Sequence, residues 1–427
     1  MKKKIVSGIL LVVLLLSMLT LASNMQPAKA GGTIYIKSDG SVDGTDKIQR
    51  DGNLYTFTDN IYDEIVVERN NIIVDGNGHT LQGSTYGRGF YLYNVNNVTI
   101  RNTNIKNFTD GVHLYYHSNN NTISGNNITE NNRHGVFVEH SSSYNSIIGN
   151  NIRNDSWNGV YFFYFSDNNT VSGNNITDNS DGVYFYFSNN NTVFGNNITN
   201  NEVGVYSYNS SCNTVSSNNI NSTSYGVYLS WSSNNNTVFG NNITNDYNGD
   251  GVHLLYSSYN TVSGNNITNN YYGVYLYESS NNTVDHNNLL DNDQHVFIET
   301  PGYANIWDDG YPSGGNYWSN YIGVDLYSNP SQNETGCDGI GDTPHVLDEN
   351  NQDNYPLMSP HEYWSNPMLG DANKDRKVDY KDLFQLAAAY GSTPAKPNWN
   401  PNCDFNNDYK IEALDLLDLS KNYGKTA

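Results

Sequence analysis

A short motif recurs along most of the chain at a nearly constant interval, and this repeat restricts the fold more than any other feature. The tetrapeptide Gly/Ser/His-Asn-Asn-Ile/Leu begins at eight positions between Gly125 and His286, and successive copies are 22 to 24 residues apart. The dipeptide Gly-Val recurs in step with it, and weaker copies extend the series from Ile65 to Ile298, making about eleven repeats. A period of this length is typical of a solenoid, in which each repeat packs only on its neighbours.

Each repeat has room for three short strands and no helix. In the copy that begins at Gly182, inward apolar side chains alternate with tyrosines over five residues, which is the period-two pattern of a strand with one buried face. Two further strands are expected at 192–194 and 197–199, separated by Gly and Asn residues that tolerate the positive φ of tight corners. One turn must therefore close on itself and stack on the next at about 4.8 Å. We predict an all-β fold, a right-handed parallel β-helix solenoid of about eleven turns.

Asparagine recurs at the corners of the predicted turns. A buried amide at the same place in every turn can hydrogen-bond its copies above and below, so we expect asparagine ladders inside the coil. Many corners also read Asn-x-Ser/Thr, for example at Asn127, Asn175 and Asn242, which is the acceptor pattern for N-linked glycan. The ladder is the simpler interpretation for most of them, and a few exposed ones are glycan acceptors if the host glycosylates.

The N-terminus has the three parts of a secretory signal peptide. Three lysines at 2–4 precede an apolar run at 5–21, and Ala-Lys-Ala at 28–30 forms a small-residue cleavage site. A membrane-spanning helix is the alternative, but it needs about 20 apolar residues and no such site. We therefore expect cleavage after Ala30 and a secreted protein that is extracellular or attached to the cell surface.

The chain is strongly acidic, with 21 Lys and Arg against 43 Asp and Glu and a formal net charge of −22. Such a charge opposes binding to nucleic acid or to an anionic membrane surface. The three cysteines, Cys212, Cys337 and Cys403, lie far apart in the sequence and show no metal-ligand spacing. In an oxidising environment outside the cell, two of them could form a disulfide and leave one free thiol, and the sequence does not say which two.

Composition and the limits of the repeat divide the chain into six parts. These are a signal peptide (1–30), an N-terminal cap (31–63), the β-helix repeats (64–300), a C-terminal cap (301–360), a linker (361–370) and a final module (371–427). Caps are expected because the two ends of a coil expose unpaired strand edges.

Aromatic residues recur at the outward positions of the first strand in each turn. Rings stacked about 4.8 Å apart would form a flat apolar strip, which suits the faces of sugars along a chain. The alternative is an aromatic ladder that only stiffens the sheet. The residues predicted to bind carbohydrate are Tyr161, Tyr184, Tyr206, Tyr228 and Tyr275.

One position in this region raises the question of a transition metal. His117 and His140 align in adjacent turns beside Glu139, and such a set could ligate Zn²⁺ or Cu²⁺. Aromatic residues continue the same column in later turns, so ring stacking is the simpler explanation.

The positions of the carboxylates in the sequence identify no catalytic residue. Glycoside hydrolysis uses two carboxyl groups about 5 Å or about 6.5–9.5 Å apart. Glu130 and Asp178 align two turns apart, but at solvated corners, and Asp110, Asp181 and Asp250 share a column in which several turns separate them. The scarcity of Arg and Lys argues against a uronate lyase. These observations favour a protein that is not an enzyme.

Several stretches resemble archaeal secreted β-helix proteins of the NosD-like type. They are Thr33-Ile34-Tyr35-Ile36, Asp75-Gly76-Asn77-Gly78-His79-Thr80-Leu81, Gly315-Asn316-Tyr317-Trp318 and Asp338-Gly339-Ile340-Gly341-Asp342-Thr343-Pro344. The repeats also resemble the carbohydrate-binding and sugar-hydrolysis class of β-helix repeat. The resemblance covers roughly residues 31–360 and implies a parallel β-helix, whereas the copper role that the name implies finds no Cys/Met/His cluster in the sequence.

Two similar acidic segments, 33 residues apart, follow the repeat region. Each places oxygen-bearing side chains at loop positions 1, 3, 5, 9 and 12, with a backbone carbonyl expected at position 7. This spacing suits Ca²⁺, and an acidic surface run is the alternative. The expected ligands of two Ca²⁺ sites are Asp371, Asn373, Asp375, Lys377, Asp379 and Asp382, and Asp404, Asn406, Asp408, Lys410, Glu412 and Asp415.

Paired loops of this kind, each followed by one helix that ends in Tyr-Gly, resemble a dockerin. The resemblance implies a small all-α, calcium-binding module at 371–427 that binds a cohesin-type module on a cell-surface or multi-enzyme scaffold. It also places partner-contacting residues just after the ninth ligand, here Tyr380 and Lys381 in the first segment and Ala413 and Leu414 in the second.

Two functions are consistent with this organisation. The first is a non-catalytic surface protein whose coil binds polysaccharide or forms part of the envelope, anchored by the dockerin. The second is a polysaccharide-degrading enzyme, a glycoside hydrolase or lyase, delivered by the same module. The sequence favours the first.

Overall fold

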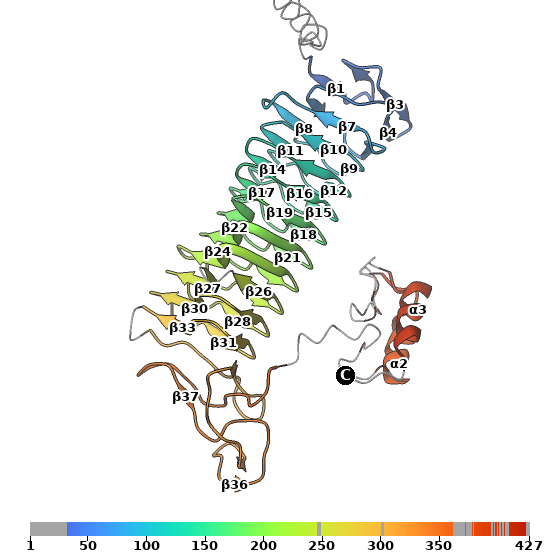
Figure 1. Ribbon diagram of the computed structural model, residues 1–427. Coiled ribbons are helices and arrows are strands. Elements are labelled where there is room, and N and C mark those ends of the chain that lie inside the picture. The colour runs from blue at the N-terminus through green and yellow to red at the C-terminus, as the bar shows by residue number, and fades with distance from the viewer. Residues whose placement is uncertain are drawn as a thin grey trace, which may run out of the picture.

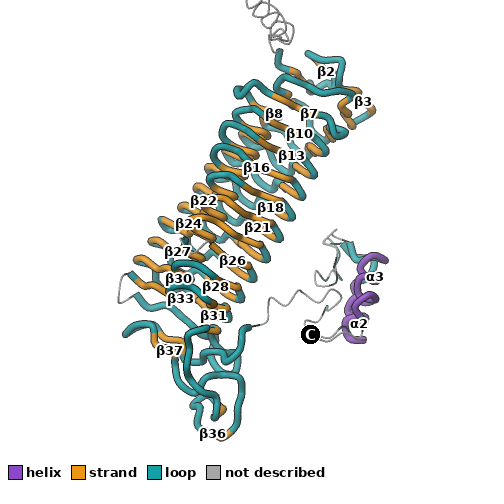
Figure 2. The backbone as a smooth tube through the Cα atoms, in the orientation of Figure 1, coloured by secondary structure: helices purple, strands orange, loops and turns teal. Residues whose placement is uncertain are grey.

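The computed structural model describes residues 32–245, 249–299 and 303–361 and, between 372 and 423, two helices with parts of the segments around them. The predicted signal peptide lies outside the described residues. From Ile34 to Ile298 the chain winds into a stack of short parallel strands (Figures 1 and 2). The prediction of a right-handed parallel β-helix of about eleven turns is confirmed.

Each turn of the coil contributes one strand to each of three ribbons. The first, called the front ribbon, carries the outward aromatic columns. Its strands are β1 (Ile34–Ile36), β5 (Ile65–Val67), β8 (Arg88–Tyr93), β11 (Asp110–Tyr115), β14 (His134–Glu139), β17 (Asn158–Phe163), β20 (Asp181–Tyr186), the second halves of β22 (Asn197–Tyr208) and β24 (Asn219–Ser230), β27 (Asp250–Leu255), β30 (Tyr272–Tyr277) and β33 (Gln294–Ile298).

The other two ribbons close the turn. The back ribbon contains β3 (Ile48–Asp51), β4 (Leu54–Phe57), β6 (Ile72–Asp75), β9 (Val98–Arg101), β12 (Thr122–Ser124), β15 (Ser146–Ile148), β18 (Thr170–Ser172), β21 (Thr192–Phe194), β23 (Thr214–Ser216), β25 (Thr237–Phe239), β28 (Thr261–Ser263) and β31 (Thr283–Asp285). The side ribbon contains β7 (Thr80–Gln82), β10 (Asn104–Lys106), β13 (Asn127–Thr129), β16 (Asn151–Arg153), β19 (Asn175–Thr177), the first halves of β22 and β24, β26 (Asn242–Asn245), β29 (Asn266–Thr268), β32 (Asn288–Leu290) and β34 (Tyr317–Trp318).

Equivalent residues of neighbouring turns lie directly opposite one another. Tyr184 of β20 pairs with Tyr206 of β22, and Val193 of β21 pairs with Val215 of β23. Inward Val, Ile, Leu and Phe side chains from all three ribbons fill the coil, and most of them have no exposed surface. The repeat spacing therefore sets the register, because a shift of one residue would turn every apolar side chain outward.

Buried asparagines form two long ladders inside the coil, as predicted. In each ladder, the Oδ1 atom of one asparagine accepts the backbone N–H of its equivalent one turn earlier, at 2.8–3.0 Å. The members are Asn121, Asn145, Asn169, Asn191, Asn213, Asn236, Asn260, Asn282 and Asn305, and Asn126, Asn150, Asn174, Asn196, Asn218, Asn241, Asn265, Asn287 and Asn316.

Both ends of the coil are covered. At the N-terminal end, β2 (Val42–Asp43) pairs antiparallel with β1, and β3 pairs antiparallel with β4. At the C-terminal end, Trp307 and Trp318 lie almost wholly buried on the last turns. Short antiparallel pairs complete this end, namely β35 (Tyr327–Ser328) with β36 (Glu334–Thr335) and β37 (His345–Val346) with β38 (Gln352–Asp353).

Two ten-residue helices follow the two predicted loops. They are α2 (Tyr380–Ala389) and α3 (Ala413–Asn422). Leu386 and Leu419 pack in a small core with Ile411 and Cys403. None of the helices in the described part of the chain is long and apolar enough to cross a bilayer.

Candidate functional site

Ten rings form one continuous column on the outward face of the front ribbon. Each ring contacts the ring of the next turn, with centroids 4.1–5.5 Å apart. We call this column the aromatic ridge. Its members are Tyr91, His113, Phe137, Tyr161, Tyr184, Tyr206, Tyr228, His253, Tyr275 and Phe297.

The rings at the centre of the ridge cover one another's faces. Tyr184 and Tyr206 lie 4.5 Å apart at an interplanar angle of 3°, and Tyr206 and Tyr228 lie 4.7 Å apart at 4°. This stacking follows from the strand spacing of about 4.8 Å in an in-register parallel sheet. The five tyrosines predicted to bind carbohydrate all lie on this ridge and are partly exposed, and Tyr184 and Tyr206 each have a ring stacked on both faces.

The ridge hydroxyls remain neutral. Burial, reinforced by neighbouring tyrosines, raises the pKa of Tyr161, Tyr184 and Tyr228 above the ordinary value of a phenol. A neutral hydroxyl can both donate and accept a hydrogen bond, which matches the hydroxyl groups of a sugar.

Exposed aromatic side chains lie beside the ridge, where the front strands end. Phe165 is 59% exposed and Trp231 is 50% exposed. Several of these rings contact each other, as Tyr93 and Tyr116 do at 5.9 Å and 10°. We call this set the aromatic rim, and its members are the exposed Tyr93, Tyr116, Tyr164, Phe165 and Trp231 and the half-buried Tyr256. Most rim rings are more exposed than the partly buried tyrosines of the ridge.

Five ionisable side chains form a continuous chain of contacts across the N-terminal end of this face. The Arg88 guanidinium lies 3.6 Å from Glu64 Oε1 and donates from Nε to His113 Nδ1 at 3.0 Å. His113 Nε2 donates to Glu139 Oε1 at 2.8 Å, and His140 Nδ1 lies 2.8 Å from Glu139 Oε2. We call Glu64, Arg88, His113, Glu139 and His140 the charged cluster.

The hydrogen bonds of His113 determine where its proton lies. Because Nδ1 accepts a hydrogen bond from Arg88, the ring carries its proton on Nε2. This N–H group donates a hydrogen bond to the Glu139 carboxylate. A second carboxyl group, that of Asp110, lies 3.9 Å from the same Nδ1 atom. His113 is therefore held between one carboxyl group on each side of the ridge.

The two carboxyl groups around His113 have opposite pKa shifts. Burial raises the pKa of Asp110 above its ordinary value, although His113 and two arginines oppose this shift. Burial also acts to raise the pKa of Glu139, but the hydrogen bonds from His113 and His140 and the attraction of their rings for a carboxylate lower it.

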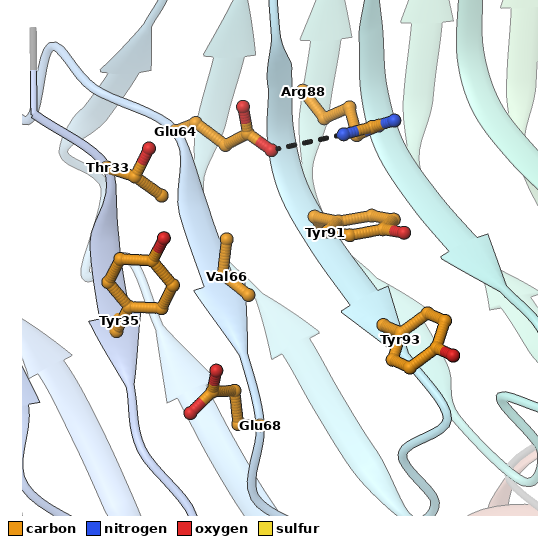
Figure 3. Close-up of a pocket in the computed structure, with 8 residues that line it drawn as sticks. All are labelled: Thr33, Tyr35, Glu64, Val66, Glu68, Arg88, Tyr91 and Tyr93. Carbon is orange, nitrogen blue, oxygen red and sulfur yellow. Dashed lines mark ion pairs between the residues drawn. The ribbon is translucent and has the colours of Figure 1, made fainter.

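An open pocket of about 390 Å³ adjoins the charged cluster on the first turns of the coil. Figure 3 shows the Glu64–Arg88 ion pair at one edge of the pocket, with Tyr35 on one side and Tyr91 and Tyr93 on the other. The remaining lining residues are Thr33, Val66 and Glu68. The Arg88 guanidinium lies 4.2 Å from the centre of the Tyr91 ring, a cation–π contact. The pocket thus lies where the ridge and the rim begin.

The Asp-Gly-Val-His sequence of β11 recurs in β27 without the rest of the charged cluster. His253 Nδ1 lies 2.7 Å from Asp250 Oδ2. The residue opposite Asp250 in the preceding turn is Tyr225, where Asp110 has Arg88. The residue that corresponds to Glu139 is Tyr277.

Most of the predicted calcium ligands lie outside the described residues. These are Asp371, Asn373, Asp375, Lys377, Asp379, Asp404, Asn406 and Asp408. Of the others, Asp382 and Asp415 are fully buried in the first turns of α2 and α3, whereas Lys410 and Glu412 are exposed. Asp415 accepts the backbone N–H groups of Phe405 and Glu412, each at 2.8 Å.

The predicted partner-contacting residues begin the two helices. Tyr380 and Lys381 are exposed in the first turn of α2, and Ala413 is exposed at the start of α3. The side chain of Leu414 lies outside the described residues.

The sequence alone did not reveal the charged cluster as a unit. Glu139 was weighed only beside His117 and His140 as a possible metal site, and neither His113 nor Arg88 was assigned a role. One signal was present, because His113 and Glu139 replace aromatic residues at adjacent turns of columns that are otherwise largely aromatic.

A comparison with protein families places this coil in a known group. The family model described as periplasmic copper-binding protein (NosD) matches residues 64–249 and 240–323. The chain belongs to the NosD family. A comparison with curated proteins gives no significant sequence match.

Three solved structures are similar to part of this NosD-family chain. The mannuronan C-5 epimerase AlgE6 A-module of Azotobacter vinelandii is 18% identical, covers 64% of this chain and 92% of its own, and has a TM-score of 0.44. A periplasmic alginate epimerase is 16% identical over 64% of this chain and 82% of its own, with a TM-score of 0.47. An alginate lyase from a Paenibacillus species is 16% identical over 60% and 90%, with a TM-score of 0.35.

The described residues of this NosD-family chain do not fit a copper site. His140 contacts Glu139, whose other oxygen accepts from His113, and the His117 ring packs on Tyr116 with centroids 4.7 Å apart. In the part of the chain that the structure describes, no three His, Cys, Asp or Glu side chains are arranged to hold a metal ion. Cys212 and Cys337 are exposed and Cys403 is buried, each as a free thiol.

Proposed function

We propose that this NosD-family protein is exported and binds a polysaccharide chain along the front ribbon of its coil. The observation that carries the proposal is the continuity of the aromatic face. The ridge forms an unbroken column of rings along the coil, and exposed rim rings lie beside it in several turns, which suits a long, repetitive ligand better than a compact one. Sugars present apolar faces and hydroxyl edges together, and the two columns offer a partner for each.

Export is part of the proposal. The basic and apolar N-terminal segment with its small-residue site supports secretion, and the family description as periplasmic agrees with it. The protein is then either extracellular or attached to the cell surface.

Attachment is proposed to occur through a C-terminal dockerin that holds two Ca²⁺ ions and binds a cohesin-type module. Two similar acidic segments, each followed by a helix with a buried aspartate in its first turn, support this part of the proposal. Oxygen ligands at that spacing suit Ca²⁺, and binding would order the two loops.

Retention on immobilised polysaccharides tests the binding function. Phe165→Ala and Trp231→Ala should each weaken binding by roughly three- to tenfold, because an aromatic contact contributes about 0.5–1.5 kcal/mol. Phe194→Ala is the matched control, since Phe194 is 37% exposed but lies on the back ribbon. Equal losses in all three variants, or no retention of the unchanged protein on any polysaccharide, would refute the proposal.

Calorimetry with Ca²⁺ on the full chain tests the anchor. Two binding events are expected, and Asp382→Ala and Asp415→Ala should each remove one. Binding of a cohesin should then require Ca²⁺. A chain that binds no Ca²⁺ at millimolar concentration would exclude the dockerin and leave the polysaccharide function untouched.

A second candidate function is an enzyme that acts on the bound polysaccharide. The charged cluster favours it, because ionisable groups with opposite pKa shifts gather at one end of a face that is otherwise mainly aromatic.

A further inference from the structure

The column of the aromatic ridge continues past Tyr91 toward the N-terminal cap, with one interruption. Val66 of β5 lies opposite Tyr91 of β8, and Tyr35 of β1 lies opposite Val66 in the turn before. The column therefore has a small side chain at Val66, where each turn of the ridge has a ring. Because successive turns are about 4.8 Å apart, the backbones that carry Tyr35 and Tyr91 are about 10 Å apart. This spacing leaves the room of one ring between them.

The pocket of about 390 Å³ lies at this gap. Its lining includes Val66 with Tyr35 on one side and Tyr91 and the half-exposed Tyr93 on the other (Figure 3). Each ring of the ridge contacts the ring of the next turn, whereas Tyr35 has no ring contact among the described residues. A ring of a ligand can therefore take the place of the missing side chain, in contact with tyrosines on both sides.

The charged groups of the pocket leave one carboxylate free. Glu64 is paired with Arg88 at 3.6 Å at one edge of the pocket. Glu68 lies at the opposite edge and is exposed, and its side chain has no ion-pair or hydrogen-bond partner among the described residues (Figure 3). Lys37, whose charge attracts Glu68, is itself paired with Asp43 at 2.9 Å. The pocket therefore has an excess of one negative charge.

A free carboxylate beside aromatic rings suits an ammonium group. Such a group forms charge-assisted hydrogen bonds with a carboxylate and is also attracted to the face of a tyrosine ring. The rest of the front ribbon favours the same charge on the ligand. No Lys or Arg occurs in the sequence between Arg153 and Lys374, although Asp and Glu recur throughout this stretch. The coil therefore attracts a cationic polymer and repels an anionic one.

We propose that this pocket binds an amino sugar, and that the polysaccharide on the front ribbon carries protonated amino groups. This inference rests on the proposed binding function and names the class of polysaccharide. The sugar ring fills the gap over Val66, and its ammonium group pairs with Glu68. The carboxylate of a uronic acid has no equivalent partner, because Glu64 already occupies the Arg88 guanidinium.

The test compares three soluble ligands that share one backbone. They are oligomers of glucosamine, of N-acetylglucosamine and of N-succinylglucosamine, which are cationic, neutral and anionic. Calorimetry on the full chain, at low salt and at a mildly acidic pH that keeps the amino groups protonated, measures each Kd. The glucosamine oligomer should bind about five- to tenfold more tightly than the acetylated one, and the succinylated one most weakly. Added salt should reduce these differences, because it screens the charges.

Two variants and one control locate the effect in the pocket. Glu68→Gln should weaken binding of the glucosamine oligomer about two- to fivefold, as expected for loss of an exposed ion pair. Asp51→Asn removes the same charge from an exposed position on β3 of the back ribbon and should leave Kd unchanged. Val66→Tyr places a ring in the gap and should weaken binding about three- to tenfold. Its melting temperature should not fall, because the Val66 side chain points outward between buried neighbours.

Each other outcome would overturn the inference. If the three oligomers bind equally, or the anionic one binds most tightly, the amino-sugar assignment is wrong and the polysaccharide function stands. Equal losses in Glu68→Gln and Asp51→Asn, or full affinity in a folded Val66→Tyr protein, would exclude the pocket. Retention on another polysaccharide without binding of any of these oligomers would exclude the amino sugar alone. Failure to bind these oligomers and every immobilised polysaccharide would overturn both proposals.

Discussion

The backbone N–H and the side-chain amide nitrogen of Asn174 both donate to the side-chain oxygen of Asn196, each at 2.9 Å. Asn196 in turn donates to the carbonyl oxygens of Val171 and Phe194 at 2.9 and 3.1 Å. The buried side chain of Asn196 thus supplies hydrogen-bond partners to four other polar atoms at one corner. Since buried polar groups without partners are destabilising, the ladder is what allows so polar a sequence to fill a coil.

Asn196→Ala is expected to lower the free energy of unfolding by about 2–4 kcal/mol. The change leaves several buried groups without partners, and each unsatisfied group costs about 1–3 kcal/mol. Asn197→Ala is the control, because Asn197 belongs to an exposed row of asparagines and is expected to lose only about 0.5 kcal/mol. Urea unfolding of the two neighbouring variants measures the difference, and equal stabilities would contradict the ladder argument.

Glycines at two kinds of position should respond differently to alanine. A Cβ atom on Gly182 would lie 2.5 Å from the Ile198 Cγ2 atom and 2.6 Å from the Gly204 carbonyl oxygen, so Gly182→Ala should destabilise the coil by about 3 kcal/mol. Gly195 has φ +63° and open space around it, so Gly195→Ala should lose only about 1–2 kcal/mol. Gly195→Asn should lose less still, because asparagine occupies the same conformation at Asn200. Thermal unfolding ranks the three, and a different order would refute this explanation.

Asp155 replaces an asparagine in a third internal ladder and makes stability depend on pH. Its Oδ1 atom accepts two hydrogen bonds from Asn131, but its buried Oδ2 atom has no partner among the described residues. Burial raises the pKa of Asp155 from 3.8 to about 8. The folded state therefore holds this proton more tightly than the unfolded state, and stability should fall as the pH rises from about 4 to 8.

Asp155→Asn should remove this dependence. The amide supplies a donor where the carboxylate has none, so the variant should be more stable by about 1–3 kcal/mol at pH 8 and nearly unchanged at pH 4. Melting temperatures measured across this range test the effect. Parallel curves for the two proteins would show that the Asp155 carboxyl group titrates normally.

Tyr206→Phe separates the two roles of the aromatic ridge. The ring keeps its stacking on Tyr184 and Tyr228 and loses one long hydrogen bond, 3.3 Å from Ser230 Oγ, so stability should fall by no more than about 0.5–1.5 kcal/mol. Polysaccharide binding should weaken by roughly two- to tenfold, because one hydroxyl hydrogen bond contributes about 0.5–1.5 kcal/mol. If Kd is unchanged and only Tyr206→Ala has an effect, through lower stability, the ridge is a stiffening ladder and the rim alone binds.

The coil could be predicted from the sequence alone because every turn has the same requirements at equivalent positions. Gly195 and Asn200 occupy corners that need positive φ, Val193 and Ile198 face inward, and the constant interval between copies implies parallel pairing in register. These requirements involve single positions and their neighbours in sequence. They are therefore visible as a period.

The chemistry of the front face was harder to predict because it depends on the direction of long side chains. Spacing placed Tyr184 and Tyr206 in one column, but only the side-chain rotamers show that their faces cover each other. Likewise, Arg88, His113 and Glu139 belong to three different turns and three different columns. They meet because extended side chains reach across the strands, which no periodic pattern encodes. The two Ca²⁺ loops remain a prediction.

Because equivalent rings recur at fixed offsets, the coil can gain or lose length in whole units. Removing the 22 residues from Tyr184 to Val205 would bring Tyr206 into the place of Tyr184 and shorten the column by about 4.8 Å. The covered ends and the Glu64 to His140 region would be undisturbed. Unequal crossing-over between the repeats would therefore change the length of the aromatic face in whole turns while keeping the contacts within each turn.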